Sequence, residues 1–151
     1  MKNFNDWNNI KQNIDTRIES ENPKDIIYYS ERDIVWISCG LNVGIESDGK
    51  GELYMRPAVI LRKLNKNHYI VLFCTTTEKV HPYYFKINSN HESLKNTKII
   101  LSQVKTIDKK RIVERLVTLS ENDFLEIKNK FIEILVNSPS LLHEGVANAR
   151  K

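Results

Sequence analysis

Six short runs rich in β-branched and aromatic residues, with turn signals between them, constrain the fold of this chain more than any other feature. They cover residues 33–39, 57–62, 69–74, 83–87, 97–107 and 112–119. Asn65-Lys66-Asn67 separates the second and third runs, which indicates a hairpin. Several short strands joined by turns are typical of a small antiparallel barrel or sandwich. The sequence therefore predicts a mainly β fold.

An amphipathic helix is predicted over residues 1–22, ahead of the strands. Its apolar stripe recurs every three or four positions and consists of Phe4, Trp7, Ile10, Ile14 and Ile18. Asn22-Pro23 should end the helix, because the residue before a proline is disfavoured in the α conformation. Such a helix can pack on the chain's own barrel or support a partner, and the pattern does not separate these two interpretations.

A second helix is predicted to follow the strands and to run to about Val136. Ser120 with Asp123 resembles a capping box, with Asp in place of the usual Glu. Apolar residues then recur at helical spacing, at Phe124, Ile127, Phe131, Ile134 and Leu135. We expect this helix to plug or flank the barrel.

Length and composition favour one domain with short extensions. The chain has 151 residues, of which 40% are hydrophobic, enough for a real core. We expect an N-terminal helical extension at 1–30, a barrel domain with its C-terminal helix at 31–136, and a flexible tail at 137–151. No apolar run approaches the roughly 20 residues of a membrane helix, and the polar N-terminus does not resemble a secretory signal. These features predict a cytoplasmic protein with no membrane partner.

Cysteine content and charge narrow the chemistry only a little. Cys39 and Cys74 each end an apolar run, so both are predicted to be buried free thiols. The formal net charge of +4 permits binding to a polyanion without requiring it. The four histidines, His68, His81, His91 and His143, are isolated in the sequence. No metal-ligand spacing, P-loop or nucleotide-binding glycine fingerprint is present, so we expect neither a metal nor a cofactor.

One stretch, residues 43–61, combines a polar loop with a buried strand. Glycines at 44, 49 and 51 allow the loop backbone to adopt positive φ. Arg56-Pro57 then precedes an apolar run at 58–61. Proline cannot donate a ladder hydrogen bond, so Pro57 is expected at the first position of a strand. Arg56 would thus be held where a mobile loop meets a rigid strand, a common location for site residues.

Other polar residues at strand ends suit contact with a phosphate. They are the threonine run after residue 74, Ser102, Gln103 and Lys105 within the fifth run, and Lys109-Lys110-Arg111 in the next turn. A guanidinium offers a rigid fork of donors to phosphate, hydroxyls can donate to its oxygens, and glutamine can read a base edge. Gathered at one end of a barrel, these residues would line a groove for single-stranded RNA.

These residues fall in blocks that resemble the MazF/PemK toxin endoribonucleases. In family order the blocks are Asp33-Ile34-Val35-Trp36, Val43-Gly44-Ile45-Glu46, Arg56-Pro57-Ala58-Val59-Ile60-Leu61, Cys74-Thr75-Thr76 and Ser102-Gln103-Val104-Lys105-Thr106-Ile107-Asp108. They cover about 31–135, and the region 50–53 looks like an insertion of the longer PemK-like branch. The resemblance implies an SH3-like barrel, a homodimer, a cognate antitoxin, and metal-independent cleavage of single-stranded mRNA at a short sequence.

The resemblance also implies roles for particular residues. The catalytic arginine and threonine of the family correspond to Arg56 and Thr75, and the glutamate of its first loop corresponds to Glu46. Contacts with RNA are expected from Thr76, Ser102, Gln103, Lys105 and Lys50.

The chain departs from the family pattern at three positions. Ser47 and Thr77 stand where glutamines are common, and Lys105 stands where the family has an arginine. The last change replaces a bidentate fork by a point charge, which bears on specificity and rate rather than on reaction type.

Two other functions are compatible with the sequence. The gyrase-binding CcdB toxins resemble this fold and act on a protein partner, and a fold does not determine a function. A catalytically degenerate barrel that only binds RNA would also fit Ser47 and Lys105. Arg56 and Thr75 favour the nuclease, with Glu46 as the candidate proton acceptor or partner of Arg56.

Overall fold

A computed structural model of the chain describes residues 1–88 and 90–137. The strands are β1 (Asp33–Ser38), β2 (Met55–Asn65), β3 (His68–Thr75), β4 (Tyr84–Lys86), β5 (Lys98–Asp108) and β6 (Ile112–Thr118), with helix α1 (Phe4–Asp15) before them and α2 (Glu121–Val136) after them. Short 3₁₀ turns lie at Pro23–Asp25, Glu92–Leu94 and Lys109–Arg111. The tail predicted at 137–151 lies almost wholly outside the described residues.

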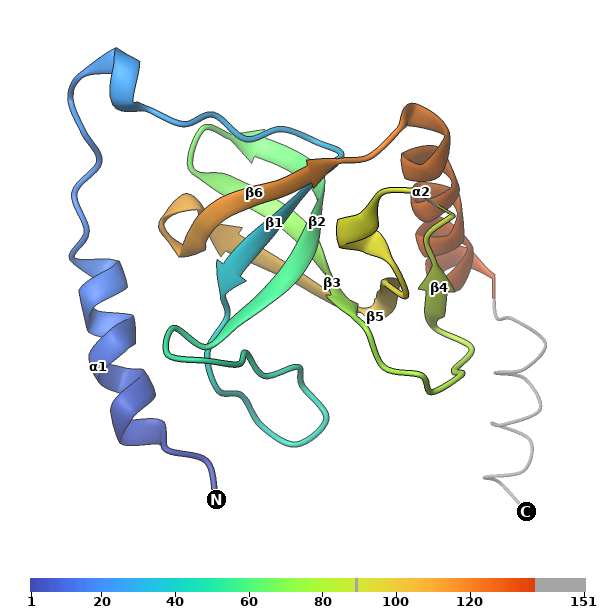
Figure 1. Cartoon of the computed structure of the whole chain (residues 1–151), viewed down its shortest axis with the longest axis horizontal. Helices are drawn as coiled ribbons and strands as arrows, with labels where there is room; N and C mark the ends of the chain where they lie inside the picture. Colours follow the sequence, from blue (N-terminus) through green and yellow to red (C-terminus); the bar gives the residue numbers. More distant parts are fainter. Residues whose placement is uncertain (89, 138–151) are drawn as a thin grey trace.

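The strands form one antiparallel six-stranded sheet in the order β4-β5-β3-β2-β1-β6. The prediction of a mainly β fold with two flanking helices is confirmed, as is the β2–β3 hairpin, whose turn is closed by a hydrogen bond from Asn67 N to Asn65 Oδ1 of 2.8 Å. The sheet curls in the manner of a barrel (Figure 1). Its edge strands β4 and β6 do not pair with each other within the described part of the chain.

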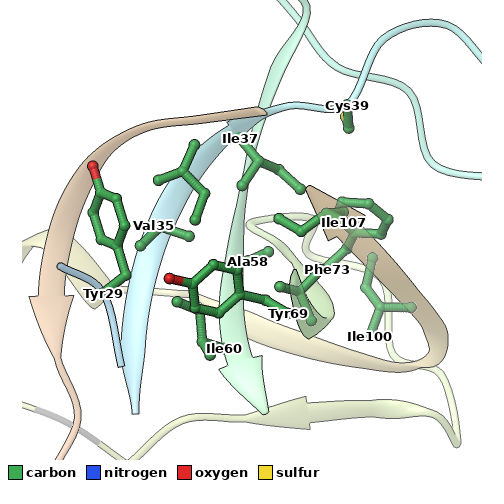
Figure 2. Packing of buried hydrophobic residues seen from close by; sticks show 12 residues of the cluster. Tyr29, Val35, Ile37, Cys39, Ala58, Ile60, Tyr69, Phe73, Ile100 and Ile107 are labelled. Atoms are coloured by element: carbon green, nitrogen blue, oxygen red, sulfur yellow. The ribbon is translucent and has the colours of Figure 1, made fainter. Parts of the chain in front are cut away.

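Alternation along the central strands divides the buried residues between two clusters. One lies within the curl of the sheet and contains Val35, Ile37, Ala58, Ile60 and Tyr69 (Figure 2). Their neighbours in sequence point to the other face and join the second cluster, where α2 covers the sheet. Because both faces are buried along β1, in the middle of β2 and along most of β3, these segments are almost continuously apolar rather than alternating.

Pro57 is not at the start of its strand, which corrects the sequence-based expectation. β2 begins at Met55, and Pro57 pairs with Trp36 of β1. Pairing with β3 begins only at Ala58, opposite Phe73. At Pro57 the strand therefore has a neighbour on one side only, so a residue without an N–H can be accommodated inside it.

Helix α1 is shorter than the predicted helix at 1–22. It ends at Asp15, where the hydroxyl of Thr16 donates to Gln12 O at 3.0 Å and the following chain turns away. Ile18, the last residue of the predicted stripe, is 90% exposed, whereas Trp7 and Ile14 are buried. The apolar period therefore identified the helix but extended it by several residues.

Helix α2 agrees with its prediction in both bounds and packing. Ser120 caps it by accepting a hydrogen bond from Asp123 N at 3.1 Å. Phe124 and Ile127 are buried against the sheet, and Phe131 and Ile134 extend this contact. None of the helices in the described residues is both long and apolar enough to cross a bilayer.

Candidate functional site

A groove of about 620 Å³ opens where β1, β2 and β3 meet the long loop between β1 and β2 (residues 39–54, the β1–β2 loop). Its walls are Trp36, Lys50, Gly51, Met55, Arg56, Pro57, Cys74, Thr75, Thr76 and Thr77. The antiparallel register that pairs Ala58 with Phe73 places the start of β2 beside the end of β3. Arg56 and Thr75, far apart in the sequence, thereby line the same groove.

Arg56 is held by backbone carbonyls from two different segments. Its Nε donates to Asp48 O at 2.9 Å, and its Nη1 donates to Cys74 O at 3.1 Å. The remaining guanidinium N–H groups have no protein acceptor among the described residues, and the side chain is half-buried in the groove wall. The guanidinium is thus oriented through part of its fork, while the other donors stay available for an anion.

Thr75 has a hydroxyl that can still donate. Its Oγ1 accepts a hydrogen bond from Thr77 N at 3.3 Å, which orients the oxygen without using its proton. Thr76 is exposed at the same rim. A phosphate placed beside Arg56 can therefore receive a hydroxyl donor from β3.

Lys50 lies across the groove on the β1–β2 loop. Its backbone and that of Met55 exchange two hydrogen bonds of 2.8 Å, so the loop returns directly into β2. The Lys50 side chain is exposed at the rim. Of the residues expected from the sequence, the groove brings together Arg56, Thr75, Thr76 and Lys50.

The other expected residues lie outside the groove walls. Glu46 is exposed on the β1–β2 loop and Ser102 is exposed on β5. Gln103 is engaged with the loop, since its Nε2 donates to Ile45 O at 3.2 Å and its Oε1 accepts from Ser47 N at 3.3 Å. In this structure the Gln103 amide ties β5 to the loop.

Lys105 belongs to a cluster of positive charge beside the loop. Burial lowers its pKa, and the nearby charges of Arg111 and Lys11 lower it further, while Cys39 and Glu46 act in the opposite direction. Lys11 comes from α1, so the helix adds positive charge to this part of the surface. A half-buried lysine among like charges is electrostatically suited to receive an anion.

Both cysteines are buried free thiols, as predicted. Burial raises the pKa of Cys74 to about 12 and also raises that of Cys39. A thiol is a nucleophile only as the thiolate, so neither cysteine provides a nucleophile near neutral pH. Across residues 1–88 and 90–137, no three His, Cys, Asp or Glu side chains converge in a way that could hold a metal ion.

Two residues of the site were missed in the sequence. Trp36 lines the groove but lies in a run of buried residues, so its sequence context suggested only core packing. Asp48 contributes a backbone carbonyl to Arg56, and backbone groups leave no signature in a sequence. Burial opposes ionisation of the Asp48 carboxyl, but hydrogen bonds from Lys2 and from Asn42 N outweigh it, so its pKa lies below the ordinary value.

The sequence of residues 30–135 matches the family model of the PemK-like, MazF-like toxins of type II toxin–antitoxin systems. The chain belongs to this family. It is 33% identical over 82 residues to endoribonuclease MazF of Staphylococcus epidermidis, a match that spans 50% of this chain and 68% of that protein. Helix α1 lies outside the matched region of the family.

Solved MazF structures share the fold. MazF of Deinococcus radiodurans superposes with a TM-score of 0.61 at 16% identity, over 73% of this chain and 98% of that one. An endoribonuclease in complex with its cognate antitoxin, from a mycobacterial species, gives 0.54 at 11% identity, over 74% and 97%. At such low identity the likeness concerns the fold, and the match to the family carries the assignment.

Proposed function

We propose that this toxin is an endoribonuclease that cuts single-stranded mRNA at a short sequence in the cytoplasm without a metal ion. The observation that carries the proposal is the shared groove of Arg56 and Thr75, in which both side chains have donors to spare. Family membership and the activity named for the staphylococcal relative support the same conclusion.

RNA supplies its own nucleophile for this reaction. The 2′-oxygen attacks the adjacent phosphorus, the bond from phosphorus to the 5′-oxygen breaks, and the leaving oxygen takes up a proton. The products are a 2′,3′-cyclic phosphate and a 5′-OH end. The enzyme needs to align these atoms and to stabilise the charge that develops on the phosphoryl oxygens. Arg56 provides that stabilisation through its free N–H groups, and Thr75 donates to a non-bridging oxygen.

The proton of the 2′-OH requires a separate acceptor. Arginine stays protonated in proteins, so Arg56 cannot serve as the base. Glu46 is the candidate from the family motif order, although its carboxylate is not part of the groove wall. A Glu46→Gln variant tests the role: loss of the acidic limb of the pH–rate profile supports Glu46 as the base, and an unchanged profile rejects it.

The remaining contacts concern binding of RNA on either side of the scissile bond. Lys50, Thr76, Ser102, Gln103 and Lys105 are proposed to bind RNA. Trp36 adds an aromatic face in the groove on which a base can stack. Replacing Trp36 by Leu should weaken binding of a non-cleavable oligonucleotide by about 1–3 kcal/mol.

A cognate antitoxin and a second copy of the chain are the proposed protein partners. Solved complexes of MazF with MazE, and of the mycobacterial endoribonuclease with its antitoxin, support the first. An acidic, disordered antitoxin segment would complement the positive charge around Lys105. Light scattering of the purified toxin tests for the homodimer, and co-purification tests for the antitoxin.

The decisive test is end-mapping of a long single-stranded RNA after incubation with the toxin in EDTA. We expect cuts at one short sequence, with 2′,3′-cyclic phosphate and 5′-OH ends. Arg56→Ala and Thr75→Ala should each lose at least about a hundredfold in rate. Cleavage that disappears in EDTA, or that persists unchanged in Arg56→Ala, would reject the mechanism. Inhibition of gyrase without RNA cleavage would instead support a CcdB-like function.

A further inference from the structure

We infer that helix α1, with the residues that precede it, positions Arg56 for catalysis by clamping the β1–β2 loop. This inference rests on the proposed nuclease function. The clamp has two anchors, Lys2 on Asp48 and the Asp6-Trp7 pair on Tyr54, and the loop transmits their effect to Arg56. Figure 1 shows α1 running beside this loop, far from α2.

The first anchor is a continuous set of polar contacts from Lys2 to Arg56. Lys2 Nζ lies 2.8 Å from Asp48 Oδ2 and donates to Asn42 O at 2.5 Å. Asp48 Oδ1 accepts from Asn42 N at 2.6 Å, and Asn42 Nδ2 donates to Ser47 O at 2.7 Å. Asp48 is therefore held through its carboxylate by Lys2, while its carbonyl accepts from Arg56 Nε at 2.9 Å.

The second anchor holds the far end of the loop. The Tyr54 hydroxyl donates to Asp6 Oδ2 at 2.6 Å, and the Trp7 and Tyr54 rings meet edge to face with centroids 5.7 Å apart. Tyr54 has a backbone φ of 48°, which is uncommon for a residue with a large side chain, and it lies two residues before Arg56. Its carbonyl accepts from Cys39 N and from Gly40 N, at 3.0 and 3.1 Å, which joins the two ends of the loop.

Trp7 also contacts the other end of the loop at Gly40. A Cβ atom built on Gly40 would lie 2.1 Å from the Trp7 ring, so the indole rests directly on the glycine backbone. Trp7 is 5% exposed although it belongs to a surface helix. The ring therefore packs against both Gly40 and Tyr54, the residues that close the loop.

The outer part of the loop needs such support because its apolar side chains bury little. Val43 and Ile45 are 74% and 94% exposed, so they contribute almost no hydrophobic stabilisation. Ordering the backbone of each residue costs about 1–2 kcal/mol. Polar contacts from Lys2, from α1 and from Gln103 help to order the loop. The contact of Lys2 leads, through Asp48, to the carbonyl that orients Arg56. Misplacement of a catalytic group by about 1 Å can cost a hundredfold in rate.

The test compares Lys2→Met with Glu19→Gln. Glu19 pairs with Lys109 and ties the same N-terminal segment to the turn between β5 and β6, so this contact is not with the β1–β2 loop. We expect Lys2→Met to lower kcat about tenfold, to change KM less than about twofold, and to have a Tm close to that of Glu19→Gln. Lys2→Arg, which keeps the positive charge, should retain most of the activity. Equal kcat in Lys2→Met and Glu19→Gln would overturn the inference.

A double-mutant cycle tests whether Lys2 acts through Asp48. Asp48→Asn keeps the backbone carbonyl but loses the ion pair. The double variant Lys2→Met, Asp48→Asn should therefore have a kcat no lower than that of the slower single variant. Losses in kcat that multiply would show that the two residues act independently, which contradicts the clamp.

Hydrogen exchange gives a readout that does not depend on cleavage. The amides of Gly49 and Met55 are bonded to Gly40 O and Lys50 O, each at 2.8 Å. Lys2→Met should accelerate their exchange about tenfold, while Glu19→Gln should not. If the unaltered toxin cuts no RNA, the proposed function fails and this comparison still decides the clamp. Exchange unchanged by Lys2→Met would overturn it.

Discussion

The two helices dock on the same domain by different physical means. Helix α2 inserts Phe124 and Ile127 into an apolar cluster that it shares with the sheet. Helix α1 buries Trp7 and Ile14, and its other contacts include hydrogen bonds to the β1–β2 loop and to the turn at Lys109–Arg111. Lys2, just before the helix, adds an ion pair to the loop. The first kind of contact stabilises the whole fold, whereas the second orders a local segment.

This difference separates contacts that stabilise the fold from contacts that orient groups of the candidate site. An apolar interface is non-directional and contributes in proportion to the area buried. Hydrogen bonds contribute less net free energy, but they fix the direction of particular groups. Helix α2 therefore suits a part of the core, and α1 suits a device that sets the geometry of Arg56. The family match at 30–135 includes nearly all of α2 and omits α1.

The largest effect is expected from truncating the core side of α2. Ile127 is fully buried, so Ile127→Ala should lower the free energy of unfolding by about 2–5 kcal/mol, through lost burial and a cavity. Leu125, which is 55% exposed on the same helix, is the matched control, with a change within about 0.5 kcal/mol for Leu125→Ala. Urea unfolding measures both. Similar losses in the two variants would mean that α2 does not dock by this face.

A smaller effect is expected at the docking surface of α1. Gly40→Ala places a methyl group against the Trp7 ring and strains a residue with a φ of 82°, so about 1–3 kcal/mol should be lost. Gly44→Ala shares a positive φ, at 57°, but meets open space, and should lose about 1 kcal/mol. Urea unfolding gives the difference, and loop hydrogen exchange locates it. Equal behaviour of the two variants would argue against the Trp7 contact.

A gain in stability, rather than a loss, is expected on removal of the charge of Lys105, which lies near Lys11 of α1. Burial and Arg111 lower the pKa of Lys105, so the folded state is less stable while this lysine is protonated. Stability should rise as pH increases from the lowered pKa toward the ordinary value of 10.5. Lys105→Met should therefore stabilise the fold at pH 7, with an advantage that shrinks as pH rises from the lowered pKa of Lys105 toward 10.5, and should weaken RNA binding. Urea unfolding and salt-dependent RNA titration measure the two effects, and exposed Lys66→Met is the control.

The smallest effect concerns the ion pair of Lys2 with Asp48. The pKa of Asp48 is lowered, so its contribution to stability is present above the ordinary value of 3.8 and is lost as pH falls through the lowered pKa. Both side chains are about one-third exposed, and we expect less than about 1 kcal/mol. The difference in unfolding free energy between the native chain and Lys2→Met should be constant from pH 5 to 7 or so and vanish in stronger acid. A difference that persists there would show that the carboxylate is not involved.

Much of the fold could be predicted because its signals are local. Strand runs, the hairpin turn at 65–67 and the capping of α2 by Ser120 each depend on a few consecutive residues. Errors arose where tertiary contacts decide the outcome. Ile18 continues a helical period but has nothing to pack on, and Pro57 sits inside β2 because β3 joins only at the next residue.

For the candidate site, the sequence predicted which residue types take part, but it did not predict every contact that these residues make. Arg56 and Thr75 follow from short motifs, and the groove brings them together as the register of β2 and β3 requires. The engagement of Gln103 with the loop could not be read from its position in β5, because the path of a long loop depends on contacts distant in sequence.

The sequence by itself determined the family, the strands and the chemistry that a guanidinium and a hydroxyl can perform, because these follow from residue identity and local period. Only the tertiary structure decided that Arg56 is oriented by the carbonyls of Asp48 and Cys74, and that Lys2 and α1 reach the loop behind it. Carbonyl groups are the same in every residue, so their convergence on one side chain depends on how the chain folds back on itself and leaves no trace in the order of amino acids.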